Sequence, residues 1–326
     1  MKIIKILVTG GCGFIGTSLV AKLSKCNNYE ITIIDNFSSS YLKNFKRSFL
    51  LIAGNKLNIS KIKIIKGDIT NTNLLLKNTK KIDCIIHLAA SAGVDVSIKN
   101  PYYDFKNNVV GFINLIEAAR LNKVKKIIIA SSGASVGNAK PPINEKINPK
   151  PVSPYGASKL TNEIYSYAYS LSYNLNPIVL RFSNVYGPGS DFKQSVISKF
   201  IKDYMQKSIN QIYGNGKQTR DFIYIDDLIS AIEKCITNKK IFNEIFQISS
   251  AREVKISEIN KIIVNELKLI GYKKLKTIYK PERKGDVFKN FSDNSKAKRM
   301  LNWKPKQNLI QGIKKTIKYF SILNNS

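Results

Sequence analysis

Short apolar runs alternate with helical stretches through the first 182 residues of the chain. The runs have the length and the β-branched composition of strands, and they end in small or polar residues. They are Ile3 to Val8, Ile31 to Ile34, Ile62 to Ile65, Cys84 to Leu88, Ile127 to Ile129 and Pro177 to Leu180. This alternation is typical of a doubly wound α/β fold, in which helices cover both faces of a parallel sheet. Ligands of such folds bind at the carboxyl ends of the strands.

The alternation loosens after Gly189, and the remainder is predicted to form a smaller mixed α/β domain. The predicted domains are residues 1–182 and 183–326, with parts of 217–240 returning to the first. Helical patterns in the second domain cover Ser195 to Gln206 and Ile256 to Leu269, another helix is capped by Asp226 or Asp227, and two more follow Asp293.

A glycine-rich loop follows the first apolar run. Gly11, Gly13 and Gly16 form a G-x-G-x-x-G pattern that opens a helix, and Asp35 ends the next strand. The glycines let a pyrophosphate approach the helix N-terminus, and Asp35 can accept hydrogen bonds from an adenosine ribose. The first domain is therefore expected to be a Rossmann-type dinucleotide-binding domain. A carboxylate at Asp35 repels a 2′-phosphate and favours NAD over NADP, although the nearby serines and Lys43 leave NADP open.

A second motif places Tyr155 and Lys159 four residues apart at the start of a helical run, so that they share one helix face. A free phenol has a pKa of about 10 and is a poor base at neutral pH. The positive charges of Lys159 and of a nicotinamide ring are expected to lower the pKa of Tyr155. The phenolate could then take a proton from a sugar hydroxyl while the carbon loses hydride.

The net charge of +31, from 53 basic and 22 acidic residues, raises the question of nucleic-acid binding. Only seven of the basic residues are arginines, and no segment combines clustered arginines with aromatic residues. We therefore expect a lysine-covered surface without a specific nucleic-acid partner.

The four cysteines have no metal-ligand spacing, and His87 is the only histidine, so no metal site is expected. No apolar run approaches the ~20 residues that span a bilayer. These features predict a soluble, cytoplasmic protein without disulfides.

Several further motifs occur in order along the chain. They are Gly67-Asp68-Ile69, Leu88-Ala89-Ala90, Asn107 to Gly111, Ser153 to Lys159, Leu180 to Pro188, Arg220 to Leu228, Arg283 to Asp286 and Leu301 to Pro305. Together with the glycine loop, they resemble the extended short-chain dehydrogenase/reductase family, and within it the NAD-dependent nucleotide-sugar epimerases such as UDP-glucose 4-epimerase. The resemblance covers essentially the whole chain.

The resemblance implies a role for each matching residue. Tyr155, Lys159 and Ser132 would be catalytic, and Asn184, Arg220, Arg283 and Asn290 would bind the nucleotide sugar. The cofactor-binding residues would be Gly10, Gly13, Phe14, Ile15, Gly16, Asp35, Asn36, Asp68, Ile69, Leu88, Ala89, Ala90, Asn108, Tyr155 and Lys159. Arg220 and Arg283 stand out because a chain that uses lysine almost everywhere places arginines at these two positions, where bidentate phosphate contacts are expected. Ion pairs with Asp221 or Asp286 are the alternative.

The chain departs from the epimerase pattern at Ser131 to Asn138, directly after the predicted strand Ile127 to Ile129. The third serine of the pattern, which in the family bonds the reacting sugar oxygen, is replaced by Gly133. We expect Ser132 to supply this hydroxyl, with Ser135 as the alternative. Related dehydratases carry an Asp-Glu pair where this chain has Ala134 and Ser135, and the absence of the pair favours epimerisation.

The predicted function is NAD-dependent 4-epimerisation of a UDP-hexose or UDP-N-acetylhexosamine through a transient 4-keto intermediate, in the biosynthesis of a polysaccharide. The alternatives are a nucleotide-sugar reductase, dehydrogenase or dehydratase of the same fold and, lastly, a non-catalytic NAD- or RNA-binding protein. Asn290 stands where glucose-specific epimerases place a bulky tyrosine, so the pocket is expected to accept a 2-acetamido group. The family pairs two helices per subunit, here Asp104 to Leu121 and Pro154 to Tyr173, which predicts a homodimer.

Overall fold

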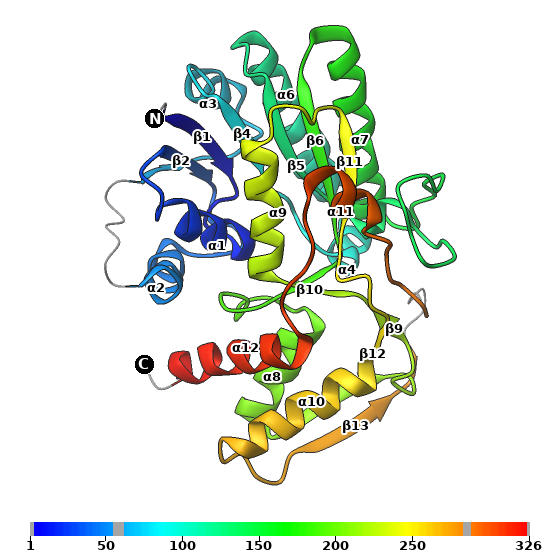
Figure 1. Cartoon of the computed structure of the whole chain (residues 1–326). Helices are drawn as coiled ribbons and strands as arrows, with labels where there is room; N and C mark the ends of the chain where they lie inside the picture. Colours follow the sequence, from blue (N-terminus) through cyan, green and yellow to red (C-terminus); the bar gives the residue numbers. More distant parts are fainter. Residues whose placement is uncertain (1–2, 55–61, 283–287, 325–326) are drawn as a thin grey trace.

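The alternating strands form one parallel sheet. The computed structural model describes residues 3–54, 62–282 and 288–324. Seven strands follow the spatial order β11-β6-β5-β4-β1-β2-β3 and pair in parallel throughout (Figure 1). They are β1 (Ile4–Thr9), β2 (Tyr29–Asp35), β3 (Lys63–Lys66), β4 (Cys84–His87), β5 (Lys126–Ser132), β6 (Asn176–Phe182) and β11 (Glu244–Ile248). The doubly wound α/β fold predicted from the sequence is confirmed.

Both faces of the sheet are buried because successive side chains of a strand point to opposite sides. In β1, Ile6 and Val8 join one apolar cluster and Leu7 joins the other. The first cluster includes residues of α1 (Phe14–Leu23), α2 (Leu42–Ala53), α9 (Ile225–Thr237) and α11 (Ser295–Leu301). The second includes residues of α3 (Thr72–Asn78), α6 (Gly111–Leu121) and α7 (Pro154–Tyr173).

The segment expected as one helix over 104–121 is divided. Helices α4 (Val94–Lys99) and α5 (Pro101–Phe105) are followed by a π-helical turn over Lys106–Val110, and α6 begins only at Gly111. Within the turn, the amide of Asn108 donates to Asp104 Oδ1 and to the backbone carbonyl of Ser91. The irregular π-helical turn therefore coincides with hydrogen bonds to a neighbouring loop. The hydrophobic pattern that predicted a single helix carries no information on such contacts.

The C-terminal part lies below the sheet in Figure 1. Helices α8 (Val196–Lys207), α10 (Ile256–Leu269) and α12 (Leu309–Asn324) pack beside a parallel pair of β8 (Ile209–Tyr213) and β13 (Lys276–Lys280). Two short strand pairs link this part to the sheet. They are β7 (Asn184–Tyr186) with β10 (Phe222–Tyr224), and β9 (Thr219–Arg220) with β12 (Val254–Lys255).

Segments after residue 182 complete the sheet domain. Strand β11 pairs with β6, and α9 and α11 cover the adjoining face. Helix α9 has Tyr224 at its N-cap position, and Asp226 and Asp227 lie in its first turn, so neither is the cap expected from the sequence. Instead, the carboxylate of Asp227 accepts the backbone N–H groups of Lys306 and Gln307, which fixes the chain that leads into α12.

The helices in the described part of the chain include none that is both long enough and apolar enough to cross a membrane.

Candidate active site

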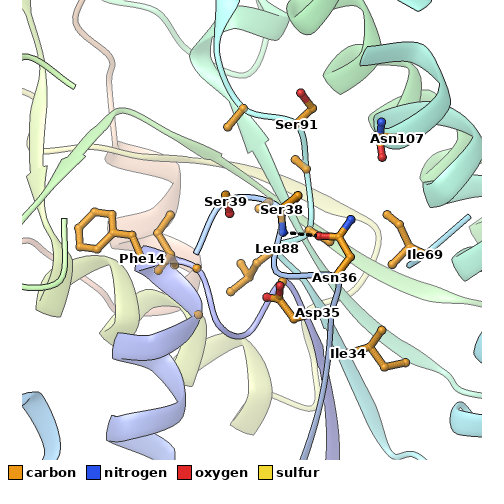
Figure 2. A pocket seen from close by; sticks show the side chains of 18 of the residues that line it. Phe14, Ile34, Asp35, Asn36, Ser38, Ser39, Ile69, Leu88, Ser91 and Asn107 are labelled. Atoms are coloured by element: carbon orange, nitrogen blue, oxygen red, sulfur yellow. Dashed lines mark hydrogen bonds between the residues drawn. The ribbon is translucent and has the colours of Figure 1, made fainter. Parts of the chain in front are cut away.

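One pocket lies at the carboxyl ends of β1, β2, β4 and β5. Figure 2 shows side chains from these strands and from the following loops around a common space. The lining runs from the glycine loop, across the end of β4, to Tyr155 and Lys159 on α7. It contains every cofactor residue proposed from the sequence except Asp68 and Asn108.

The glycine loop packs so closely that side chains would not fit. A Cβ at Gly16 would lie 2.4 Å from the carbonyl oxygen of Gly10, and Gly10 itself has a φ of +72°. Helix α1 begins after Gly13 without a side-chain cap. The first backbone N–H groups of the helix are therefore available to an anion, as a dinucleotide pyrophosphate requires.

Asp35 ties the glycine loop to the end of β2. Its Oδ2 accepts the backbone N–H of Cys12 at 2.9 Å, and its Oδ1 accepts that of Phe37 at 2.8 Å. Burial raises the pKa of Asp35, and the two hydrogen bonds act against this rise. Because an ionised carboxylate has about four acceptor sites, two remain for ribose hydroxyls.

Asp68 lies behind the pocket and contacts it through Asn36. The Asn36 amide donates to Asp68 Oδ2 at 2.7 Å, and Asn36 Oδ1 accepts the Ser38 backbone N–H, which is the dashed line in Figure 2. Burial acts to raise the pKa of Asp68, but hydrogen bonds from Thr70 and Asn36 bring it below its usual value. Asp68 thus orients Asn36, which lines the pocket.

Asn108 also lies behind the pocket. Its amide group exchanges two hydrogen bonds with the Ser91 backbone, at 2.8 and 2.9 Å. Ser91 and the neighbouring Asn107 line the pocket. The structure therefore places Asn108 as a support for the loop after β4.

Tyr155 and Lys159 share one face of α7, as expected from their spacing. Lys159 Nζ lies 5.8 Å from the centre of the Tyr155 ring and donates to the backbone carbonyl of Ala130 at 3.0 Å. Burial raises the pKa of Tyr155 to about 12, and a hydrogen bond with the Ser132 side chain acts in the opposite direction. Burial also lowers the pKa of Lys159 to about 8, against the charges of Asp104 and Glu163. The protein alone does not lower the pKa of Tyr155, because burial outweighs the favourable contacts.

Ser132 and Ser135 occupy different environments. The Ser132 side chain accepts the Ala134 backbone N–H at 3.2 Å and acts to lower the pKa of Tyr155, whereas the Ser135 hydroxyl lies 2.9 Å from Glu163 Oε1 and 2.8 Å from the Ser132 carbonyl oxygen. A hydroxyl has a single proton to donate, and that of Ser135 faces these two acceptors. The geometry favours Ser132 for contact with a reacting oxygen.

The only histidine lies below the pocket and is not an acid–base group. His87 is 1% exposed, and its Nδ1 lies 2.8 Å from the Thr9 hydroxyl. Burial, together with the charge of Lys159, lowers the pKa of His87 to about 3. It is therefore neutral at physiological pH.

The residues proposed to bind the substrate do not line one common pocket, in contrast to most of the cofactor residues. The Asn184 side chain donates to the Asp221 carbonyl, and Arg220 lines a separate cavity with Tyr213 and Gln218. Asn290 is half-buried. Backbone hydrogen bonds hold the chain on both sides of it, because the Phe288 carbonyl accepts the Thr219 N–H and the Phe291 carbonyl accepts the Ile143 N–H. Arg283 lies outside the described residues.

The carboxylate of Asp221 has partners other than arginine. It accepts hydrogen bonds from Ser250, Ala251 and Ser292, and no ion pair joins it to Arg220. The alternative of an ion pair between Arg220 and Asp221 is therefore wrong, and the alternative pairing with Asp286 lies outside the described residues.

Lys193 also lines the pocket and was not singled out by the sequence. Burial lowers the pKa of its ammonium group. None of the described acidic side chains forms an ion pair with it, and Asp191 pairs instead with Arg47 at 3.2 Å. In a chain with so many lysines, the sequence carried no signal for this position.

The chain matches the protein-family model described as GDP-mannose 4,6 dehydratase over residues 7–316. Its fold is similar to that of a UDP-glucose 4-epimerase from Thermotoga maritima, solved with UDP-glucose, at 34% identity and a TM-score of 0.89, covering 98% of this chain and 100% of the other. It is similar to a UDP-N-acetylglucosamine 4-epimerase from Methanobrevibacter ruminantium at 31% identity and a TM-score of 0.89, covering 99% and 100%. It is also similar to a UDP-glucuronic acid 4-epimerase from Bacillus cereus, solved with UDP-glucuronic acid and NAD, at 29% identity and a TM-score of 0.88, covering 98% and 100%.

Proposed function

This chain belongs to the GDP-mannose 4,6-dehydratase family within the extended short-chain dehydrogenases/reductases, and on that premise we propose that it epimerises a UDP-sugar at C4 with bound NAD. One observation carries the proposal: Tyr155 and Lys159 line one end of a pocket whose other end is formed by the glycine loop and Asp35, and Ser132 lies near enough to Tyr155 to act on its pKa. The solved relatives described above are 4-epimerases, and one of them holds NAD.

The residues of the pocket have distinct tasks in this reaction. Bound NAD supplies the acceptor and the donor of hydride at the sugar C4. Tyr155 takes the proton of the 4-hydroxyl as C4 is oxidised, and returns it to the same oxygen when C4 is reduced on its other face. Ser132 holds this oxygen. Lys159 uses one of its three N–H groups on the Ala130 carbonyl, which leaves two for the ribose next to the nicotinamide.

Tyr155 must be ionised before it can take up a proton, and its ionisation requires a compensating positive charge. With a pKa raised to about 12, the phenol is protonated at neutral pH. The charges that favour its ionisation are those of Lys159 and of an oxidised nicotinamide ring. The positive charge of the oxidised ring would thus favour the ionised form of Tyr155. Tyr155 would then be ready to remove the substrate proton when the cofactor is able to accept hydride.

The environment after β5 favours epimerisation over dehydration, although the family model carries a dehydratase name. Elimination of water needs a further acid and base, and the two positions that carry them in dehydratases are Ala134 and Ser135 here. Ser135 is already bound to Glu163. A reductase or dehydrogenase that exchanges its cofactor remains the second candidate.

For the substrate, we propose a UDP-hexose or a UDP-N-acetylhexosamine. Arg220, Arg283, Asn184 and Lys193 would bind its diphosphate, and the small side chain of Asn290 would leave room for a 2-acetamido group. Lys193 is added because a half-buried ammonium that forms no ion pair with the described acidic side chains favours an anion. The diphosphate would stay fixed while the sugar turns.

We also propose a cytoplasmic homodimer that serves polysaccharide assembly. The outer face of α7 exposes apolar side chains, with Leu171 at 67% and Tyr167 at 57%, and α5 exposes Tyr102 and Phe105 beside it. The inner face of α7 buries polar residues instead. The exposed apolar face is therefore available to a second copy, and the four free cysteines fit a reducing compartment.

Light scattering tests the dimer. At micromolar concentration we expect a mass of two chains for the wild type and of one chain for Leu171→Glu. A monomeric wild type would contradict the dimer without affecting the chemistry.

The proposed function is tested by incubating purified protein with UDP-, GDP- and dTDP-sugars, without added cofactor. We expect a UDP-sugar to be converted to its 4-epimer. Turnover that requires added NAD(P)H would favour the reductase instead.

A further inference from the structure

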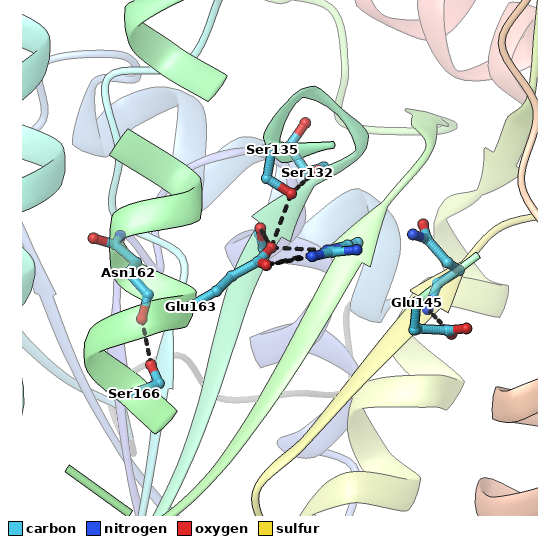
Figure 3. A network of polar contacts seen from close by, with 9 residues as sticks. Ser132, Ser135, Glu145, Asn162, Glu163 and Ser166 are labelled. Carbon is cyan, nitrogen blue, oxygen red and sulfur yellow. Dashed lines mark hydrogen bonds and ion pairs between the residues drawn. The ribbon is translucent and has the colours of Figure 1, made fainter. Parts of the chain in front are cut away.

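A buried ion pair lies directly below the residues that surround Ser132. Glu163 of α7 and Arg181 of β6 are each 2% exposed in their side chains, and Arg181 NH2 lies 2.6 Å from Glu163 Oε2. Arg181 Nε also donates to Glu163 Oε1 at 3.0 Å. Figure 3 shows Glu163 reaching from the helix toward the sheet, with Ser132 and Ser135 next to its carboxylate.

The same carboxylate binds the serines on both sides of Ser132. Glu163 Oε1 accepts the hydroxyl of Ser131 at 2.5 Å and that of Ser135 at 2.9 Å. The Ser135 hydroxyl is also 2.8 Å from the carbonyl oxygen of Ser132. The backbone that carries Ser132 is therefore attached to one charged group at the residue before it and at a residue three positions after it.

Three separate elements converge on this point. Glu163 follows Lys159 by four residues on α7, so one face of the helix carries both. Ser131 and Arg181 are register partners in the pairing of β5 with β6. The arrangement therefore couples the helix that carries Tyr155 to the strand end that carries Ser132.

Stability alone does not account for the pair. Two charges removed from water gain little over well-packed apolar residues, because desolvation opposes their attraction. Arg181 NH1 has no hydrogen-bond partner within the described chain, which adds a further penalty. The pair therefore holds a geometry that an apolar contact would not specify.

The turn needs such support because Gly133 follows Ser132. The space beside Gly133 is open, because a Cβ built there meets nothing within 4 Å. The turn therefore has no packing contact from a side chain at this residue. Glycine also allows more backbone freedom than any other residue. Attachment of Ser131 and Ser135 from below offsets that freedom.

From these contacts we propose that Glu163 and Arg181 are positioning residues, which hold the Ser132 hydroxyl against Tyr155 through Ser131 and Ser135. The inference rests on the proposed 4-epimerisation, since it assigns to Ser132 the contact with the reacting oxygen. Neither Glu163 nor Arg181 touches substrate or cofactor in this account.

The test uses serine variants, because Glu163→Gln would leave a buried arginine uncompensated and could fail to fold. Ser131→Ala with Ser135→Ala keeps the ion pair but detaches the turn. We expect kcat to fall by about 10- to 100-fold, as misplaced catalytic groups do, while KM and the bound NAD stay within about twofold. Ser166→Ala is the matched control, since this buried serine of α7 donates only to the Asn162 carbonyl.

A rescue separates positioning from a general structural effect. Gly133→Ser, placed in the double variant, fits the open space at this position and offers a second hydroxyl that can contact the reacting oxygen when Ser132 is misplaced. We expect it to restore about tenfold or more of the lost kcat. Thermal unfolding of each variant is measured in parallel.

An unchanged kcat in the double variant would overturn the positioning role. So would a loss that Gly133→Ser does not restore, or one matched by losses of bound NAD and thermal stability. A wild-type protein that turns over no UDP-sugar would instead contradict the proposed function. Wild-type turnover is measured first, so the two failures are distinguishable.

Discussion

The cofactor side and the substrate side of the pocket are built in different ways. On the cofactor side, backbone groups at the ends of neighbouring parallel strands form the lining, and the glycine loop and Asp35 are separated by one helix and one strand. On the proposed substrate side, Asn184, Arg220 and Asn290 come from segments far apart in the sequence. Asn184 bonds to Asp221, Arg220 lines a separate cavity, and Asn290 lies in a segment held by Thr219 and Ile143.

This difference matches the tasks of the two sides. A cofactor that stays bound is served by a rigid lining, and close packing around Gly16 provides it. A 4-keto sugar that must turn over between the oxidation and the reduction of C4 would need a fixed diphosphate and room around the ring. The two sides would meet at Tyr155, which lies on α7 of the sheet domain and for which we propose contact with the substrate.

Tyr155→Phe should distinguish the two sides most clearly, because it is expected to reduce turnover strongly without affecting cofactor binding. The change removes the proton acceptor and little volume, so NAD should remain bound while kcat falls by about 10²- to 10⁴-fold. Bound NAD is measured after denaturation, and turnover with the best UDP-sugar. Rates near those of the wild type at neutral pH would remove Tyr155 from the mechanism.

Gly16→Ala should damage only the cofactor side. The added Cβ would meet the Gly10 carbonyl at 2.4 Å, a contact with backbone that cannot rotate away. Overpacking of this kind costs about 1–3 kcal/mol, which corresponds to roughly 10- to 100-fold weaker NAD binding. Full NAD content in the purified variant would show that the loop is less rigid than its packing indicates.

The sequence predicted the local fold of the cofactor side because its signals are local. A strand, a glycine turn and a helix follow one another at Ile4–Leu23, and the period of the apolar residues identifies each. The sequence could not choose between Ser132 and Ser135, because the choice depends on Glu163 and Arg181, which are distant in the chain. Nor could it detect Lys193, whose burial depends on the fold of the loop before α8.

Other differences have the same cause. Strand β11 joins the sheet more than sixty residues after β6, which no local pattern predicts. Asp227 resembles a helix cap in sequence, but it binds the backbone near Lys306. In both cases a contact between distant segments decides the structure.

Lys193→Met should weaken the binding of whichever diphosphate the ammonium contacts, that of NAD or that of the UDP-sugar. A charged hydrogen bond contributes about 1.5–3 kcal/mol, so we expect about a tenfold change. A loss of bound NAD would assign Lys193 to the cofactor, and a rise in KM would assign it to the UDP-sugar. Lys207→Met, on the exposed end of α8, is the control and should change neither. No change in either quantity for Lys193→Met would exclude the contact.

Asn290→Tyr should have the smallest effect, and only on substrate choice. A larger side chain beside the sugar would disfavour a 2-acetamido group, with a change of roughly tenfold in the ratio of kcat/KM for UDP-N-acetylglucosamine to that for UDP-glucose. Activity on UDP-glucose alone, unchanged by the substitution, would show that Asn290 does not control the size of the pocket.

The fate of the C4 hydrogen tests the central claim most directly. A UDP-sugar labelled with deuterium at C4 is incubated with the purified protein, without added cofactor, and the position of the label is determined in the 4-epimer by NMR. Because C4 would be oxidised and reduced within one closed pocket, we predict that the label returns to C4 of the product. Loss of the label to solvent, or its appearance at C6 of a dehydrated product, would contradict the proposed 4-epimerisation.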